Sequence, residues 1–193
     1  MPQGTQLIVG LGNPGAEYAQ TRHNAGAWFV EELADKMHAV LRHVTQFQGL
    51  HCFTQVHNQN CHLFIPTTFM NHSGQAVQAL ASYYKIAPEA ILVLHDEIDL
   101  PVGAARLKFD GGHGGHNGLR DIIQHLGTKQ FYRLRIGVGH PGNSREVVDY
   151  VLKSPRKGER EQIDLVLKEV SKVLPLMLAG EYQKAMQQLH TTK

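Results

Sequence analysis

The sequence contains few residues of the kind that build disulfides or thiol chemistry. It has two cysteines among 193 residues, and neither belongs to a CxxC pair, which argues against a zinc site or a redox motif. Cys52 and Cys61 flank a predicted hairpin through residues 57–60, so they can lie on neighbouring strands. We expect both to be free core thiols. No serine stands in a GxSxG motif, so a serine nucleophile is not predicted.

Long hydrophobic runs are also absent. No apolar stretch approaches the roughly 20 residues needed to span a bilayer, which excludes a membrane protein. Residues 1–5 lack the basic start and apolar stretch of a secretory signal, so we expect a cytoplasmic protein. A hydrophobic fraction of 42% and a charged fraction of 19% are those of a globular protein. The length suits one catalytic domain over residues 1–193.

The charge is distributed unevenly along the chain. Residues 1–102 hold four lysines and arginines against eight acids, whereas residues 103–157 hold ten against four. Such a basic segment attracts a phosphate backbone. A solvated face with scattered counter-ions explains the same count equally well.

Strand-like and helix-like patterns alternate along the chain. The segments that predict strands are residues 6–10, 51–56, 61–65, 90–94 and 132–138. The segments that predict helices begin after Thr21 or Asn24, at Ser73 and at Asn117, each of which can cap its helix, and a helical tail follows over about 159–189. Pro175 should divide this tail near Leu174. The pattern predicts an α/β fold, a single globule with a central mixed, mostly parallel β-sheet flanked by helices.

The segment GLGNPG, residues 10–15, follows the first predicted strand and fits the GxGxxG pattern. In a dinucleotide site the third glycine opens a helix, and an acid follows about 20 residues on at the end of a strand. Here Pro14 occupies the turn, and the acids near that distance lie on a helix. The glycines are better interpreted as a tight turn that projects Asn13, or as a turn with no further role.

His23 lies in the motif TRHNAG, residues 21–26, at the start of a helix. The partial positive charge of a helix N-terminus keeps an imidazole neutral, and thus available as a base, unless a carboxylate counters it. Asp96 follows the clearest buried strand and can be that carboxylate if the two loops meet over the sheet. A base and its orienting acid without a nucleophile predict activation of water. The alternative is a structural histidine.

Two other functions stay open at this point. Asp96, Glu97 and Asp99 can gather Mg²⁺ in a metal-dependent nuclease. On an extended backbone, however, Glu97 points away from the other two, and a second acidic cluster is lacking. We therefore favour acid–base chemistry and predict no metal. A non-catalytic RNA-binding protein, in which His23 and Asp96 are structural, is the other alternative.

Two further motifs place polar groups in loops. The stretch GGHGGHNG, residues 111–118, exposes backbone amides beside His113, His116 and Lys108, which suits an RNA terminus or a phosphate. The alternative is a mobile surface loop. In TTFMN, residues 67–71, Phe69 can simply be a core residue. Asn71 can join the amides of Asn13 and Asn117 in one cleft that reads peptide carbonyl and N–H groups.

Six motifs occur in one order, namely GLGNPG, TRHNAG, TTFMN, HDEIDLP, GGHGGHNG and LRIGVGHPG. With them the chain resembles bacterial-type peptidyl-tRNA hydrolase from about Gln6 to the terminal helices. The resemblance implies a monomeric, cytoplasmic α/β enzyme that recycles tRNA from peptidyl-tRNA dropped by ribosomes. It also implies that no cofactor is required.

The resemblance also assigns roles to residues. It implies that His23 is the catalytic base, that Asp96 stabilises its protonated form and that Asn13 discriminates N-blocked substrates from free aminoacyl-tRNA. The positions that match substrate contacts are Tyr18, Phe69, Asn71 and Asn117, with Met70 and His116 beside them. Lys108 and Arg135 match a pair that clamps the 5′-phosphate of tRNA. Asn117 or Asn71 would hold the water or stabilise the oxyanion.

Overall fold

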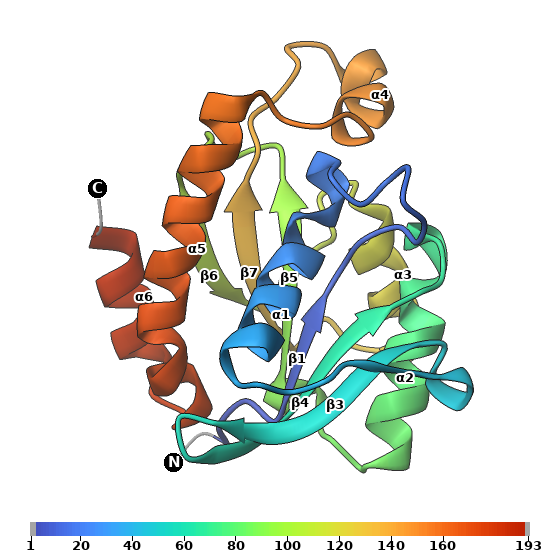
Figure 1. The fold of residues 1–193 in the computed structure, drawn as a ribbon, viewed down its shortest axis with the longest axis vertical. Coiled ribbons are helices and arrows are strands. Elements are labelled where there is room, and N and C mark those ends of the chain that lie inside the picture. The colour runs from blue at the N-terminus through green and yellow to red at the C-terminus, as the bar shows by residue number, and fades with distance from the viewer. Residues whose placement is uncertain (1–2, 192–193) are drawn as a thin grey trace.

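Seven strands form one mixed sheet in the computed structural model, which describes residues 3–191 (Figure 1). The strands are β1 (Leu7–Gly10), β2 (Arg42–Val44), β3 (Gly49–Val56), β4 (Gln59–Pro66), β5 (Ile91–Glu97), β6 (Ala105–Phe109) and β7 (Tyr132–Gly137). Their order is β2-β3-β4-β1-β5-β7-β6. The central strands β4, β1, β5 and β7 are parallel, and the outer pairs β2–β3, β3–β4 and β6–β7 are antiparallel. The predicted mixed sheet is confirmed.

Helices cover both faces of this sheet, as predicted. They are α1 (Ala25–Lys36), α2 (Ser73–Tyr83), α3 (Asn117–Leu126), α4 (Val147–Val151), α5 (Lys157–Leu178) and α6 (Tyr182–Thr191). Short 3₁₀ turns include η1 (Arg22–Asn24), η3 (Met70–His72) and η5 (Ser144–Glu146). Helices α1, α5 and α6 pack on one face, and α2 and α3 on the other. None of these helices has the length and apolar character needed to cross a membrane.

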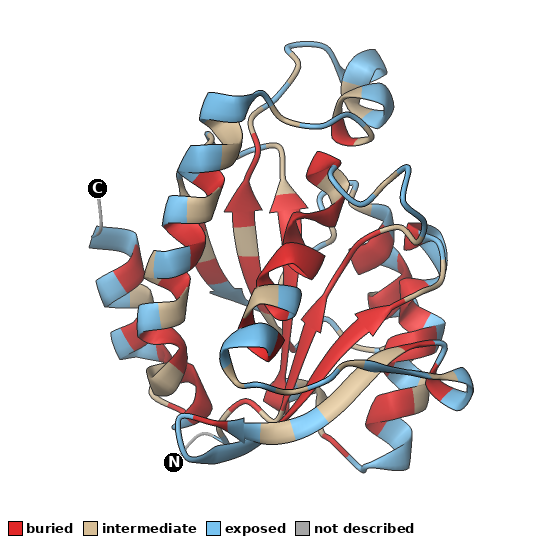
Figure 2. Ribbon diagram, viewed as in Figure 1, coloured by how far each residue is buried: buried red, intermediate tan, exposed pale blue. Residues whose placement is uncertain are grey.

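The central strands are buried on both sides, which explains their continuous apolar runs. Ile8 and Leu92 belong to the core under α1 and α5, whereas Leu7 and Val93 belong to the core under α2 and α3. All four side chains are fully buried, and each contributes about 1.5–3 kcal/mol by its removal from water. Figure 2 shows this buried layer running through the sheet to the ends of β1 and β5. The core therefore provides a rigid support for these strand ends.

The predicted helix caps are wrong at three positions. Thr21 and Asn24 precede η1 and α1, but neither side chain makes a cap hydrogen bond. The amide of Asn24 instead exchanges hydrogen bonds with the backbone of Asn13. Ser73 donates to the carbonyl of Met70 rather than accepting from the helix. A tertiary contact thus takes the amide of Asn24, whereas Thr21 and Ser73 each donate to the carbonyl three residues earlier.

Two segment boundaries also differ from the prediction, and three elements were not predicted. Strand β5 continues through His95 and Asp96 to Glu97, because β7 supplies a pairing partner for each residue. Helix α5 passes through Pro175 and ends at Leu178, and Gly180, with a φ of 80°, turns the chain into α6. The edge strands β2 and β6 and the short helix α4 were not predicted at all.

The predicted hairpin is confirmed, with a tighter turn than expected. Strands β3 and β4 meet at His57 and Asn58, whose φ angles of 49° and 66° are those of a type I′ turn. Cys52 lies on β3 and Cys61 on β4, and both thiols are free, as predicted.

Candidate active site

Two glycines let helix α1 begin directly against the ends of β1 and β5. A Cβ on Gly26 would lie 2.1 Å from the carbonyl oxygen of Leu94, and one on Gly10 would lie 2.4 Å from the carbonyl oxygen of Gly26. Only glycine permits such an approach. The consequence is that η1, which carries His23, lies next to the last residues of β5.

Asp96 is shared by two histidines at this point. His23 Nδ1 lies 2.9 Å from both carboxylate oxygens, and His116 Nε2 lies 2.9 Å from Oδ1. The side chain of Asp96 is 2% exposed, and those of His23 and His116 are 11% and 9% exposed. The predicted meeting of His23 with Asp96 is confirmed. The contact with His116 was not predicted.

The hydrogen bonds define the tautomer of each imidazole. A carboxylate can only accept, so His23 donates through Nδ1 and His116 through Nε2. Nδ1 of His116 accepts from the backbone N–H groups of Gly118 and Leu119, so it carries no proton. Nε2 of His23 is left without a protein partner among the residues described here. It is therefore the nitrogen that can receive a proton.

The electrostatics of the three groups follow from burial and proximity. Burial lowers the pKa of His23, but the charge of Asp96 and its hydrogen bond outweigh burial, so this pKa is raised. Burial would raise the pKa of Asp96, yet the two histidines hold it well below its usual range. Asp96 thus stays ionised and favours a protonated His23. The partial charge of the helix N-terminus therefore does not keep His23 neutral, because Asp96 is the carboxylate that counters it.

A third histidine, His95, is buried beside Asp96 and His116. His95 donates through Nδ1 to the backbone carbonyl of Asp96 over 2.8 Å, and its ring packs edge-on against His116. Burial, together with the nearby His116, lowers the pKa of His95 to about 3. His95 is therefore neutral and adds no charge beside the carboxylate.

The acidic residues after β5 do not gather as a magnesium site would require. Glu97 binds Nε of Arg135 at 2.9 Å and also accepts from the backbone N–H of Asp99, so it turns away from Asp96. His23, Asp96 and His116 do lie close enough to be a ligand set. Since Nδ1 of His116 accepts from two amides, its Nε2 keeps its proton and has no lone pair for a metal.

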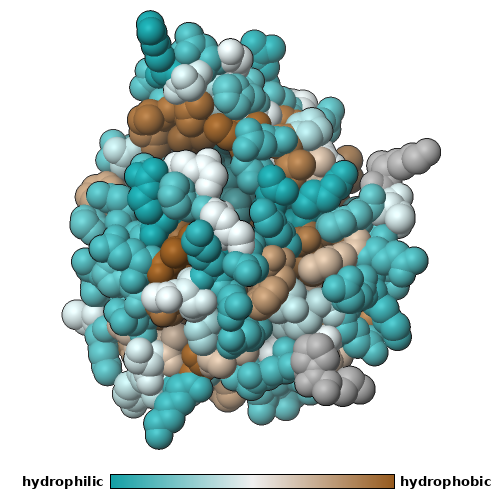
Figure 3. Space-filling model, turned by 180° about the vertical axis from the view of Figure 1, so that it is seen from behind, coloured by the Kyte–Doolittle hydropathy of each residue, from teal (hydrophilic) through white to brown (hydrophobic). Residues whose placement is uncertain are grey.

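A cavity of about 340 Å³ opens beside His23. Its walls come from the ends of η1 and β5, the glycine loop, the start of α3, and α4 with the turn before it. They are formed by His23, Asp96, Glu97, Ile98, Gly114, Gly115, His116, Asn117, Ser144, Val147, Val148 and Val151. Figure 3, which shows the molecule from behind, has an apolar patch at the end where α4 lies, and Val148 there is 64% exposed. The cavity thus has a polar floor and an apolar wall.

Asn13, on the turn between β1 and η1, is held in a fixed orientation by hydrogen bonds to Asn24 and Met70. Its Oδ1 accepts from the backbone N–H of Met70 at 2.7 Å, and its own N–H donates to Asn24 Oδ1 at 2.9 Å. The amide Nδ2 of Asn13 therefore remains as a donor. The side chains of Met70 and His116 both lie close to Gly118, so Met70 is a neighbour of both Asn13 and His116.

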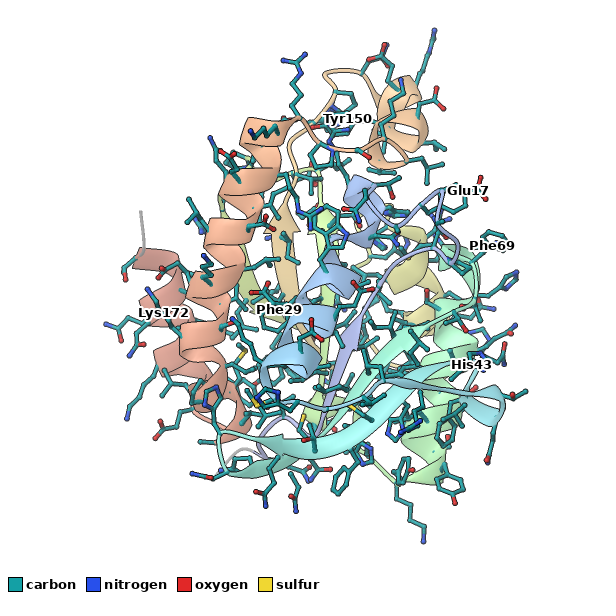
Figure 4. All side chains as sticks on the ribbon, viewed as in Figure 1. Glu17, Phe29, His43, Phe69, Tyr150 and Lys172 are labelled. Carbon is teal, nitrogen blue, oxygen red and sulfur yellow. The ribbon has the colours of Figure 1, made fainter. Side chains whose placement is uncertain are left out.

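The loop residues Tyr18, Phe69 and Asn71 lie near Met70 but do not line the cavity. Tyr18 and Phe69 make an edge contact with ring centroids 6.5 Å apart, and Phe69 is 57% exposed. Figure 4 shows Phe69 on the loop before α2, and Tyr150 lies on α4 itself. Of the three asparagines predicted to share one cleft, only Asn117 is among the residues that line this cavity, and Asn71 is exposed.

Lys108 and Arg135 meet in a second cavity of about 300 Å³. It is lined by His95, Glu97, Asp99, Lys108, Gly112, His113, Gly114, Leu119, Arg133 and Arg135. Arg135 is paired with Glu97, whereas Lys108 has no ion pair within residues 3–191. Arg133 is buried and donates to the carbonyls of Gly112 and Lys129, which holds the glycine loop in place. Glu97 lines both cavities, so they are neighbours.

Several wall residues were missed by sequence reasoning. Val147, Val148 and Val151 are spaced as one face of a helical turn, and this pattern was a detectable signal for α4. His116 was placed beside the substrate, but its cap role was assigned to Asn117. In the structure His116 is the N-cap of α3 and Asn117 is its first residue.

Comparisons with known proteins identify the family of this chain. The family model for peptidyl-tRNA hydrolase matches residues 7–193. The peptidyl-tRNA hydrolase of Nitrosospira multiformis is 55% identical over 97% of this chain and 98% of its own, and that of Marinobacter nauticus is 53% identical over 100% and 98%. The crystal structure of the enzyme from Acinetobacter baumannii superposes with a TM-score of 0.95 at 47% identity, covering 98% of this chain and 96% of that one. The chain therefore belongs to the peptidyl-tRNA hydrolase family.

Proposed function

We propose that the chain, as a peptidyl-tRNA hydrolase, cleaves the ester between the peptide and the 3′-terminal ribose of tRNA with a water activated by His23. The observation that carries this mechanism is the pair His23–Asp96, in which Nδ1 is bound at 2.9 Å to both carboxylate oxygens while Nε2 is left for the water. A positioned base of this kind contributes roughly 10²–10⁴ in rate.

The chemical step uses groups of this chain alone. His23 Nε2 takes a proton from the water, whose oxygen bonds to the ester carbonyl carbon. Asp96 supports the imidazolium that forms. The carbon–oxygen bond to the ribose then breaks, and the proton passes from His23 to the ribose oxygen. The products are a peptide with a free carboxyl group and a tRNA with a free terminal hydroxyl, and no cofactor or metal is needed.

The remaining residues are assigned by their position around this step. Asn117, which lines the cavity, or Asn71 would stabilise the oxyanion or hold the water. Nδ2 of Asn13 would donate to a carbonyl of the blocked amino group. Tyr18, Phe69 and Met70 would contact the peptide. These roles rest on the family pattern and on the grouping of the side chains.

The second cavity would hold the 5′ end of the tRNA, whereas the first would hold the 3′ end that carries the ester. Lys108 and Arg135 present cations there, which supports a clamp on the 5′-phosphate beside the acceptor end. We further propose that residues 1–193 act as one monomeric domain in the cytoplasm, where the product tRNA is reused. The two cavities share lining residues, which supports an ester site and a phosphate site that lie side by side.

The testing experiment measures release of a labelled N-acetyl-aminoacyl group from tRNA, with EDTA present and free aminoacyl-tRNA in parallel. We expect cleavage of the acetylated substrate alone. His23→Ala should lose about 10²–10⁴ in kcat with little change in tRNA affinity. Near-normal turnover by His23→Ala would remove the base from the mechanism. Inhibition by EDTA would favour the nuclease-like metal chemistry, and tRNA binding without release would favour a non-catalytic protein.

A further inference from the structure

Arg22 is a buried charged residue directly before the proposed base, and the mechanism above does not use it. It is 7% exposed. Its Nη1 donates to the backbone carbonyls of Tyr150 and Lys153 at 2.9 and 3.3 Å, and its Nη2 binds Glu159 Oε1 at 3.3 Å. Burying a guanidinium costs free energy unless hydrogen bonds and an ion pair replace the lost water, and Arg22 makes both.

All of these contacts reach one region, the junction between α4 and α5. The guanidinium also stacks over the ring of Tyr150, with its central carbon 3.9 Å from the ring centroid. The backbone N–H of Arg22 donates to the carbonyl of Lys153 at 3.0 Å. Glu159 in turn accepts from the backbone N–H of Arg156 at the start of α5. Arg22 therefore binds the end of α4 through its backbone, its charge and its flat face.

Helix α4 has few other supports. It projects from the end of the sheet at the top of Figure 1, connected by loops on both sides. Besides the contacts to Arg22, Tyr150 donates through its hydroxyl to the carbonyl of Val138 at 2.6 Å. The valines of α4 (Val147, Val148 and Val151) face the cavity beside His23 and form its apolar wall. The position of this wall thus depends on the residue next to the base.

We propose that Arg22 is a positioning residue that holds the apolar wall of α4 against the active-site cavity, so that substrate binding depends on it. The proposal rests on the proposed function of that cavity. Arginine is required because its planar guanidinium donates in two directions while stacking on Tyr150. A lysine carries the same charge but offers neither the fork nor the flat face.

Two substitutions separate the fork from the charge. Arg22→Lys keeps the charge, and Arg22→Met removes it. In both variants we expect the amides of residues 147–153 to exchange hydrogen about tenfold faster or more, because charge-assisted hydrogen bonds to α4 are lost. The KM for N-acetyl-aminoacyl-tRNA should rise by a similar factor, about tenfold. The kcat should change much less, since the bond from His23 to Asp96 is untouched.

A matched control is available in Arg160 of α5. It binds the segment just before η1 and does not contact α4. It binds Gln20 and Asp164 and stacks over Trp28 at 3.5 Å. Arg160→Gln should leave both the exchange of residues 147–153 and KM unchanged. Tyr150→Leu removes the ring from the other side of the contact together with the hydroxyl bond to Val138, so it should speed exchange of residues 147–153 at least as much as Arg22→Met. Tyr150→Phe keeps the ring, so its smaller effect measures the share of the hydroxyl bond, and this pair of variants tests the contact even if Arg22→Met folds poorly.

Three outcomes would overturn the proposal. Unchanged exchange in α4 would show that Arg22 does not hold it, and faster exchange throughout the chain would show a general structural role. Full recovery of KM in Arg22→Lys would show that the charge alone acts on the tRNA. Because exchange is measured without substrate, it tests the hold on α4 even if the proposed hydrolysis fails.

Discussion

His116 donates through Nε2 to Asp96 Oδ1 over 2.9 Å while its Nδ1 caps the first turn of α3. One imidazole thus joins the start of a helix to the carboxylate that orients the proposed base. Because both nitrogens are engaged, the ring has a single tautomer and cannot rotate. Helix α3 therefore helps to position Asp96 through His116, whose ring lies 4.9 Å from that of His23.

This double role predicts that stability and activity can be separated at His116. In His116→Asn the amide oxygen can still cap α3, but the side chain is too short to reach Asp96. We expect this variant to keep its stability within a few tenths of a kcal/mol, whereas His116→Ala should lose about 1 kcal/mol with the cap. Both should lose about tenfold in kcat, since one hydrogen bond to the buried carboxylate is gone. Urea unfolding and single-turnover assays measure the two effects, and full activity in His116→Asn would contradict the role.

A second prediction concerns Asp96 and the pH dependence of the reaction. The pKa of His23 is raised because the charge and hydrogen bond of Asp96 outweigh burial. In Asp96→Asn only burial remains, so this pKa should fall below 6.5 and the acid limb of kcat/KM should move to lower pH. The plateau should drop by about 10²–10⁴, because the tautomer of His23 is no longer held.

The control for this prediction is Asp99→Asn, which removes a nearby acid that makes no bond to His23. Its pH profile should match that of the unaltered chain. An acid limb that stays in place in Asp96→Asn would mean that another group than His23 governs the rate.

Sequence reasoning predicted the start of α3 at Asn117 from a local pattern, and it predicted the meeting of His23 with Asp96 from the tendency of α/β folds to gather functional groups at strand ends. It failed where tertiary contacts compete with local preference. Asparagine is a better N-cap than histidine, so Asn117 was chosen, yet the bond to Asp96 brings His116 into that position. Likewise His95 and Asp96 have low strand propensity, but the ladder with β7 extends β5 over them.

Asn13 offers a prediction on substrate selectivity. Asn13→Asp keeps an oxygen that accepts from the N–H of Met70 but replaces the Nδ2 donor by a second carboxylate oxygen. We expect kcat/KM for N-acetyl-aminoacyl-tRNA to fall by about tenfold to a hundredfold, because a carbonyl would face a negative charge. Free aminoacyl-tRNA should become a better competitor, since its ammonium group can pair with the new carboxylate.

The comparison variant for this site is Asn13→Ala, which loses the donor without adding charge. It should lower kcat/KM for the blocked substrate but leave the free aminoacyl-tRNA unimproved. Both substrates should be measured side by side with the unaltered chain and the two variants. If all three proteins had the same selectivity, a residue other than Asn13 would distinguish the blocked amino group from the free one.

The cavity that holds Lys108 and Arg135 predicts a dependence on salt. Lys108 has no ion pair among the described residues, so Lys108→Ala should lower the slope of log binding constant against log salt by about one. Arg135→Ala should weaken binding more, because it also leaves Glu97 unpaired and facing the phosphate. Adding Glu97→Gln to Arg135→Ala should then restore part of the loss. The control is Lys36→Ala, at the far end of α1, which should keep the slope of the unaltered chain. The measurement is a salt titration of tRNA binding. If the Lys108 and Arg135 variants also kept that slope, the phosphate would lie outside this cavity.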